Sequence, residues 1–262
     1  MSHYKVLFLD IDGTIITPDD KIEDSTQIAV TKAQEQEIEV FLATGRPIHE
    51  ILDIAKTLKV NSFIGYNGAF GIYKGEDLYK DFMPPDLVKN FLKIAEEYDH
   101  EIVLYTNKHN AFTSLDSPIV KNFITKFHLQ QNELYNESDL NNILGITLIN
   151  VNGNEDRHYV NEGEVHLTQV HVEGMENCFD VIRDHVNKGF GVNSVLKHLG
   201  IGKEEAIAFG DGLNDKEMLM NVGESFAMGN AHPDLFSYAK HKTTAVGHSG
   251  ILNGLKVLGL ID

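Results

Sequence analysis

Short apolar runs alternate with amphipathic segments over residues 1–82. The runs "YKVLFLD", "IEVFLAT" and "NSFIGY" are typical of buried strands, and the segments between them have the spacing of amphipathic helices. Strands that alternate with helices form parallel βαβ units, with right-handed crossovers and helices on both faces of the sheet. The alternation therefore predicts a doubly wound, Rossmann-like α/β core built on a parallel sheet.

The alternation is interrupted in the middle of the chain. It stops at "MPP", residues 83–85, and resumes after "NKG", residues 187–189. Between these points, two expected helices stand among several strands, which include "EIVLYTN", "GITLINVN" and "EVHLTQVHV". Such an arrangement is typical of an α+β module. We therefore expect a core formed by residues 1–82 and 185–262, interrupted by an inserted α+β domain over residues 83–184.

Local signals indicate where several core helices begin and end. Asp24 or Ser25 suits the N-cap of a helix over "DSTQIAVTKAQEQE", and Pro47 suits the first turn of a helix that runs to about residue 58. Gly200 is a typical stop for the helix "GVNSVLKHLG". The segment "HPDLFSYA" near the end of the chain also reads as a helix.

The charge of the chain restricts its partners. The formal net charge is −17, so the surface does not attract nucleic acid or anionic membranes, and a phosphorylated substrate needs a local cation. The single cysteine, Cys178, excludes an intrachain disulfide, and no apolar stretch approaches the length of a membrane span. We expect a soluble, cytoplasmic protein with neither a nucleic-acid nor a membrane partner.

Polar signals follow four of the expected segments. They are "DIDGT" after the first strand, "ATGR" after the second, "NKG" after the insertion and "GDGLND" after a late strand. In an open parallel sheet, ligands bind beyond the carboxyl ends of the strands, so we expect these signals to gather at one edge. The residues concerned are Asp10, Asp12, Thr44, Gly45, Lys188, Asp211, Asn214 and Asp215.

These residue types suit phosphoryl chemistry at a hard cation. Carboxylate oxygens without nearby thiolates are the ligands that Mg²⁺ prefers, and a cation makes clustered carboxylates tolerable. The Thr44 hydroxyl, the Gly45 N–H and the Lys188 ammonium can hold phosphoryl oxygens. A carboxylate can also act as a nucleophile and form an aspartyl-phosphate. On an extended strand Asp10 and Asp12 would share a face, so a turn at Gly13 would re-aim Asp12.

In this order, the four motifs resemble those of the haloacid dehalogenase superfamily of phosphotransferases. The later "MGNAHPDL" and "GHSGILNGLKVLG" are similar to the end of its Cof-like branch, which carries a class IIB cap. The resemblance covers both halves of the core, whereas the expected cap, residues 83–184, has no motif of its own. It implies the fold expected above, with a Mg²⁺ cofactor.

The resemblance also implies a role for each residue. Asp10 corresponds to the nucleophile, and Asp12 to the acid that protonates the leaving oxygen and then activates water. The implied metal ligands are the Asp10 carboxylate, the Asp12 carbonyl and the Asp211 carboxylate, with Asp215 acting directly or through water. The implied phosphate-binding residues are Thr44, Gly45, Lys188 and Asn214.

Several of these residues also have structural interpretations. Thr44 could cap the next helix, Asn214 could be an N-cap, and Asp215 could pair with a helix dipole. Arg46 either forms a local salt bridge or contacts the substrate.

The expected function is Mg²⁺-dependent hydrolysis of small phosphorylated metabolites, such as sugar phosphates, through an aspartyl-phosphate. The alternatives are a sugar phosphomutase of the same family and a catalytically inactive regulatory binding protein. The sequence assigns neither a physiological substrate nor an oligomeric state.

Overall fold

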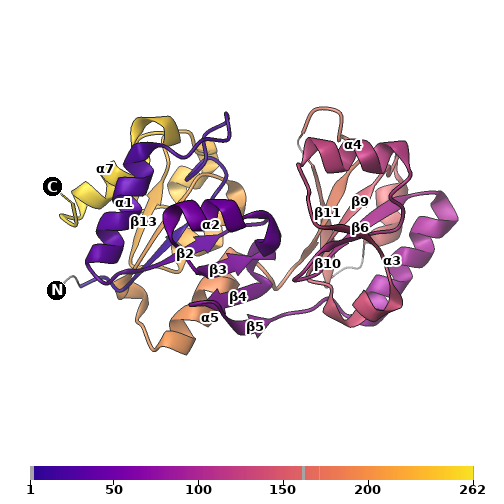
Figure 1. The fold of residues 1–262 in the computed structure, drawn as a ribbon, viewed down its shortest axis with the longest axis horizontal. Helices are drawn as coiled ribbons and strands as arrows, with labels where there is room; N and C mark the ends of the chain where they lie inside the picture. Colours follow the sequence, from indigo (N-terminus) through magenta and orange to yellow (C-terminus); the bar gives the residue numbers. More distant parts are fainter. Residues whose placement is uncertain (1–2, 161–162, 171, 262) are drawn as a thin grey trace. The chain divides into compact units, whose positions relative to one another are not determined.

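The computed structural model describes residues 3–160, 163–170 and 172–261, and these form two compact units (Figure 1). The core unit contains the described residues up to Arg46, then Ile51–Tyr79, then the described residues from Asn187 onward. The cap unit contains Pro47–Glu50 and Lys80–Val186. The expected insertion of residues 83–184 stays a prediction, because a compact unit is not by itself an independently folding domain.

The core unit is built on a mainly parallel sheet, as the sequence predicted. In the described residues its strand order is β14-β13-β12-β1-β2-β3-β4-β5. The parallel strands are β1 (Val6–Leu9), β2 (Glu39–Ala43), β3 (Ser62–Gly65), β12 (Ala206–Gly210), β13 (Glu224–Ala227) and β14 (His241–Lys242). Two further strands extend the sheet beyond β3, namely β4 (Phe70–Tyr73), antiparallel to β3, and β5 (Glu76–Lys80).

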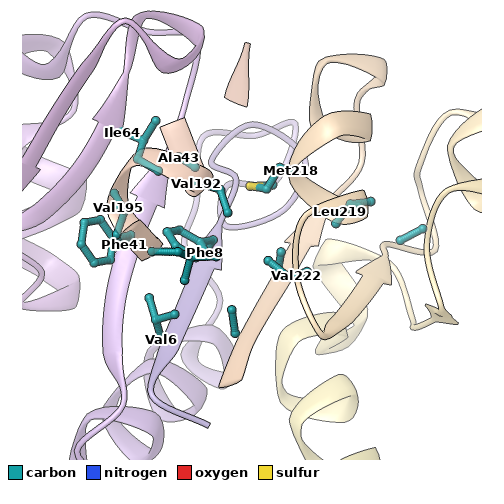
Figure 2. Close-up of a cluster of buried hydrophobic side chains, with 14 of the residues drawn as sticks. Val6, Phe8, Phe41, Ala43, Ile64, Val192, Val195, Met218, Leu219 and Val222 are labelled. Carbon is teal, nitrogen blue, oxygen red and sulfur yellow. The ribbon is translucent and has the colours of Figure 1, made fainter. Parts of the chain in front are cut away.

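Helices cover both faces of this sheet. On one face, α5 (Lys188–Leu199) and α6 (Lys216–Met220) pack onto alternate strand residues such as Phe8 and Phe41 (Figure 2). On the other face, α7 (Gly250–Val257) packs so closely that a Cβ on Gly254 would lie 2.4 Å from the Phe209 ring. Beside α7 lies α1 (Asp24–Glu35), which also neighbours α2 (Leu52–Leu58).

The cap unit contains a separate sheet of order β10-β11-β9-β6-β7-β8 in its described residues. Its strands are β6 (Glu101–Tyr105), β7 (Asn110–Phe112), β8 (Asn132–Leu134), β9 (Gly145–Ile149), β10 (Val165–Gln169) and β11 (Phe179–Arg183). Two apolar clusters hold its helices. Phe91 of α3 (Pro85–Tyr98) packs with Leu104, and Phe123 of α4 (Pro118–Lys126) packs with Val103. Because Val103 and Leu104 are consecutive on β6, their side chains point to opposite faces of the sheet.

Short 3₁₀ helices connect these elements. They are Ile48–Glu50, Tyr66–Gly68, Glu137–Asn142, Glu155–Tyr159, Lys203–Glu205, Leu213–Asp215, Pro233–Ser237 and Val246–His248. In the described residues, no helix combines the length and the apolar character that a membrane span needs.

Some expected helix boundaries were wrong. The N-cap of α1 is Glu23 rather than Asp24 or Ser25, and its side chain makes no capping bond. A single helix from Pro47 does not form, because Ile48–Glu50 is a 3₁₀ turn that belongs to the cap unit.

The segment "HPDLFSYA" contains only the 3₁₀ helix Pro233–Ser237, where the Ser237 hydroxyl bonds to the carbonyl of Asp234 and competes with helical pairing. The stop at Gly200 is confirmed, since this residue adopts a left-handed conformation with φ 64°. The short strands β8 and β14 lay in segments that gave no strand signal.

We predict that Gly254→Ala destabilises the core unit. Alanine favours a helix over glycine by about 1 kcal/mol, but the added methyl would meet Phe209 and Phe226, and overpacking costs about 1–3 kcal/mol. The net effect is a lower urea midpoint with an unchanged slope. Lys256→Ala, at an exposed position of the same helix, should leave the midpoint unchanged. A midpoint at or above the wild-type value for Gly254→Ala would contradict this packing.

Candidate active site

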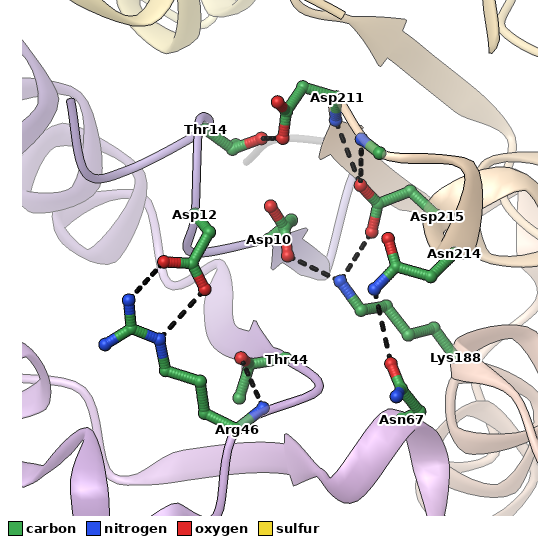
Figure 3. A network of polar contacts seen from close by, with 11 residues as sticks. Asp10, Asp12, Thr14, Thr44, Arg46, Asn67, Lys188, Asp211, Asn214 and Asp215 are labelled. Atoms are coloured by element: carbon green, nitrogen blue, oxygen red, sulfur yellow. Dashed lines mark hydrogen bonds and ion pairs between the residues drawn. The ribbon is translucent and has the colours of Figure 1, made fainter. Parts of the chain in front are cut away.

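The register of the core sheet brings three motif residues to the same edge. Leu9, at the end of β1, lies level with Leu42 of β2 and Phe209 of β12. The next residues of these strands lead into Asp10, Thr44 and Asp211 (Figure 3). The expected gathering of strand-end residues at a carboxyl edge is therefore present.

A tight turn separates the two acids of "DIDGT". The Ile11 carbonyl accepts the N–H groups of Thr14, Ile15 and Ile16, which reverses the chain directly after Asp10. Gly13 has φ 80°, and a Cβ there would lie 2.1 Å from an Asp211 oxygen, so both conformation and space favour glycine. As a result Asp10 is buried, whereas the Asp12 side chain is 54% exposed.

Lys188 supplies the positive charge at the centre of the site. Its side chain is fully buried, and its ammonium donates to Asp10 Oδ1 and, at 2.6 Å, to Asp215 Oδ1 (Figure 3). Burial alone would lower the pKa of Lys188, but the two carboxylates more than offset this, so its pKa lies above the usual value. Lys188 is the first residue of α5, where a positive charge opposes the helix dipole, so its carboxylate partners are what make this position favourable.

Three carboxylates converge beside Lys188. Asp10, Asp211 and Asp215 each offer an oxygen, and these oxygens lie within 4.8 Å of one another. Burial, followed by the charge of Asp215, raises the pKa of Asp211 to about 6, and the same two causes raise the pKa of Asp10 against the effect of Lys188. This excess of negative charge and the all-oxygen donor set fit a hard divalent cation such as Mg²⁺.

Asp215 also organises the loop that carries Asp211. Its Oδ2 accepts the N–H groups of Asp211 and Gly212, both at 3.0 Å, and its other oxygen accepts from Lys188. The Asp215 side chain thus accepts backbone N–H groups at the start of the short helix Leu213–Asp215, and its pairing with a helix dipole stays an interpretation. The same bonds hold its carboxylate within the acidic cluster.

The remaining motif residues surround this cluster. Thr44 is buried and its hydroxyl accepts the Arg46 N–H at 3.0 Å, while α2 begins only at Leu52, so Thr44 does not cap that helix. The Arg46 guanidinium binds both oxygens of Asp12, which makes it a local salt-bridge partner. Gly45 is exposed in the same loop.

Asn214 does not cap α6, whose N-cap is Asp215, and its side-chain amide donates to Asn67 Oδ1 at 3.2 Å.

Sequence reasoning missed two asparagines at this edge. Asn67 lies in a left-handed conformation with φ 52°, beside Asn214, and the dipeptide Asn67-Gly68 is a common turn signal that could have indicated its position. Asn230 donates to the Gly13 carbonyl at 2.8 Å and to Asp211 at 3.2 Å, and its oxygen accepts the Val246 N–H. The segment "MGNAHPDL", which contains Asn230, could have indicated this role.

Residues 7–255 match the family of haloacid dehalogenase-like hydrolases. The chain therefore belongs to this family, as the four motifs predicted, and its buried Asp10–Lys188 pair and acidic cluster lie at the motif positions.

The chain is also similar to individual members of this family. It is 33% identical to YkrA of Bacillus subtilis (strain 168) over 98% of each protein, and 26% identical to the HMP-PP phosphatase of Escherichia coli (strain K12) over 91% of this chain and 89% of that protein. A solved structure from Geobacillus kaustophilus HTA426 aligns with a TM-score of 0.91 at 29% identity, covering 98% of this chain and all of that one. The subclass IIB sugar phosphatase BT4131 aligns with a TM-score of 0.81 at 25% identity, with the same coverage.

We predict that Mg²⁺ stabilises the protein more at about pH 7.5 than at about pH 5. Because the folded-state pKa of Asp211 is raised to about 6, the metal-free fold gains stability by binding a proton as the pH falls from about 6 toward the ordinary value of 3.8. Above pH 6 the same carboxyl is ionised and repels its neighbours until a cation binds. At a pH one unit below this pKa, protonation of Asp211 should weaken Mg²⁺ binding by about tenfold.

Thermal melts with and without Mg²⁺ at both pH values test this prediction. Asp211→Asn should lose most of the Mg²⁺-dependent rise in melting temperature at both pH values. Asp19→Asn, an exposed acid outside the cluster, should retain it. An equal rise at both pH values in the unmodified protein would contradict the assignment.

Proposed function

We propose that this protein is a Mg²⁺-dependent phosphatase that hydrolyses small phosphorylated metabolites through an aspartyl-phosphate on Asp10. The observation that carries the proposal is the contrast between two acids two residues apart. Asp10 is buried, bonded to Lys188 and part of the acidic cluster, whereas Asp12 is exposed. One carboxylate is therefore held as a nucleophile, and the other, paired with Arg46, lies where it can exchange protons with solvent.

In the first half-reaction, an Asp10 oxygen attacks phosphorus, and the bond from phosphorus to the leaving oxygen breaks. Asp12 donates a proton to that oxygen as it leaves. In the second half-reaction, Asp12 takes a proton from a water molecule that attacks the same phosphorus, and the Asp10–phosphorus bond breaks. Inorganic phosphate leaves, and both aspartates return to their starting states.

The other residues neutralise and position the phosphoryl group. Lys188, the Thr44 hydroxyl, the Gly45 N–H and Asn214 can bind its oxygens, which suits a reaction that depends on positioning and charge. When bound to Asp10, Asp211 and the Asp12 carbonyl, with Asp215 in support, Mg²⁺ supplies the positive charge that lets a phosphate approach these carboxylates. A local supply is needed, because the chain as a whole carries a charge of −17.

The relatives support a small phosphorylated substrate. One is named as an HMP-PP phosphatase and another as a sugar phosphatase, so both names denote phosphatases of small metabolites. We therefore infer that the substrate is a sugar phosphate or a similar phosphomonoester. A phosphate-release screen should include both sugar phosphates and HMP-PP.

We predict that Asp10→Asn lowers phosphate release by more than about 10³-fold while the protein stays folded, because an amide cannot form the acyl-phosphate. Circular dichroism and thermal melts check folding, and Asp19→Asn is the matched control. Phosphate release by Asp10→Asn at a rate near the wild-type value would exclude Asp10 as the nucleophile.

We also predict that EDTA abolishes phosphate release and that added Mg²⁺ restores it.

Incubation with a hexose monophosphate, with and without a hexose bisphosphate, then separates hydrolysis from the two alternatives. A phosphatase releases inorganic phosphate in both reactions. A phosphomutase would instead yield the isomeric monophosphate, and an inactive binding protein would yield neither product with any substrate of the panel.

A further inference from the structure

The loop of the "ATGR" motif continues directly into the cap unit. Thr44, Gly45 and Arg46 belong to the core unit, the next four residues, Pro47–Glu50, belong to the cap unit, and Ile51 belongs to the core unit again. No residue separates Arg46 from this segment, so the backbone that leaves Arg46 runs directly into it. The contacts of this segment therefore bear on the residue that follows Arg46 in the chain.

Asn110, on strand β7 of the cap unit, holds the segment with both ends of its side-chain amide. The side chain is fully buried. Its Oδ1 lies 2.9 Å from His49 Nε2, and its Nδ2 donates to Glu50 Oε1 at 2.7 Å. The same Nδ2 donates to Asn132 Oδ1 at 3.1 Å, and Glu50 Oε1 also accepts the backbone N–H of Gln130.

Charge complementarity allows one orientation of this amide. A flipped Asn110 would place its oxygen against the Glu50 carboxylate, which is an acceptor only. With the amide as described, His49 Nε2 must carry the proton that Asn110 Oδ1 accepts. His49 Nδ1 is then a bare lone pair, and it has no hydrogen-bond partner in the described part of the chain. Burial lowers the pKa of His49, which agrees with a neutral ring.

These contacts are well shielded from water. The side chains of His49 and Glu50 are 8% and 7% exposed. A buried polar group that loses its partner pays the full cost of its desolvation, so the three residues keep one arrangement. The upstream end of the loop is held in the core unit, where Thr44 N–H donates to the Ile64 carbonyl and Asn67 N–H donates to the Thr44 carbonyl.

We propose that Asn110 is a positioning residue for the phosphate-binding loop, acting through His49 and Glu50 on Thr44, Gly45 and Arg46. The core unit holds the loop at Thr44 and, through the Tyr66 N–H, at the Arg46 carbonyl, and the segment bonded to Asn110 follows Arg46 directly. The effect on turnover rests on the proposed phosphatase function. The restraint on the loop does not depend on that function.

Variants of this amide test the proposal. Asn110→Leu removes both bonds to the segment, and Asn110→Asp sets two carboxylates against each other at about pH 8. In Asn110→Asp/Glu50→Gln the donor and acceptor are exchanged, so the bond is restored with reversed polarity. Asn132→Ala is the matched control, because it removes the third bond of the same amide without touching Pro47–Glu50.

Hydrogen exchange of residues 44–50 reads the restraint without any substrate. We expect exchange about tenfold faster in Asn110→Leu and Asn110→Asp, and near wild-type rates in the double variant and in Asn132→Ala. Inhibition by inorganic phosphate should weaken about tenfold in the same two variants and recover in the double variant.

The proposal is overturned if Asn110→Asp leaves exchange of this loop unchanged, or if the double variant fails to restore it while melting like the wild type. If Asn110→Leu does not fold, Asn110→Asp and the double variant still test the proposal. Failure of the phosphatase proposal is seen separately, as a wild-type protein that releases no phosphate while the exchange pattern holds. In Asn110→Asp, a rise in KM that exceeds the fall in kcat would distinguish loop positioning from a general loss of folded enzyme.

Discussion

Lys188 neutralises two buried carboxylates that the carboxyl edge of the sheet could not otherwise accommodate. Its ammonium is bonded to Asp10 and Asp215, and none of the three side chains is more than 7% exposed. Removing the cation would leave two charges buried without compensation, which typically costs about 3–5 kcal/mol. Asp10 in turn fixes where a phosphoryl group can be attacked, and Asp215 holds the backbone that carries Asp211. Stability and proposed chemistry thus depend on the same ion pairs.

The site remains short of positive charge even with Lys188 in place. Asp211 adds a further carboxylate, whose pKa is raised by burial and by the charge of Asp215. Arg46 is engaged by Asp12 rather than by the cluster. Mg²⁺ would offset the negative charge of the carboxylates, and a substrate phosphate would offset the positive charge of Mg²⁺. The two therefore suit this edge together.

The sequence predicted those features that arise from local pattern. Apolar periodicity predicted the parallel core sheet, and the residues after Leu9 and Phe209 were expected at one edge because parallel strands end together. Contacts made by lone polar side chains across long separations were not predicted. Asn230 bonds to Gly13 across 217 residues, and no spacing rule encodes such a pair. The helix expected from Pro47 is instead a 3₁₀ turn, and the bonds from its His49 and Glu50 to distant Asn110 are of the same long-range kind.

The return of the chain from the cap unit has a consequence for the order of folding during synthesis. Asp10 is made early, whereas its partner Lys188 follows 178 residues later, and β12, the neighbour of β1, comes later still. The strands of the cap sheet, by contrast, come from one continuous stretch of chain. On a ribosome the cap sheet can pair while the core sheet still lacks its central neighbour and its buried cation. The core is therefore the slow, long-range step, and the nascent first strands are the part that most needs protection from aggregation.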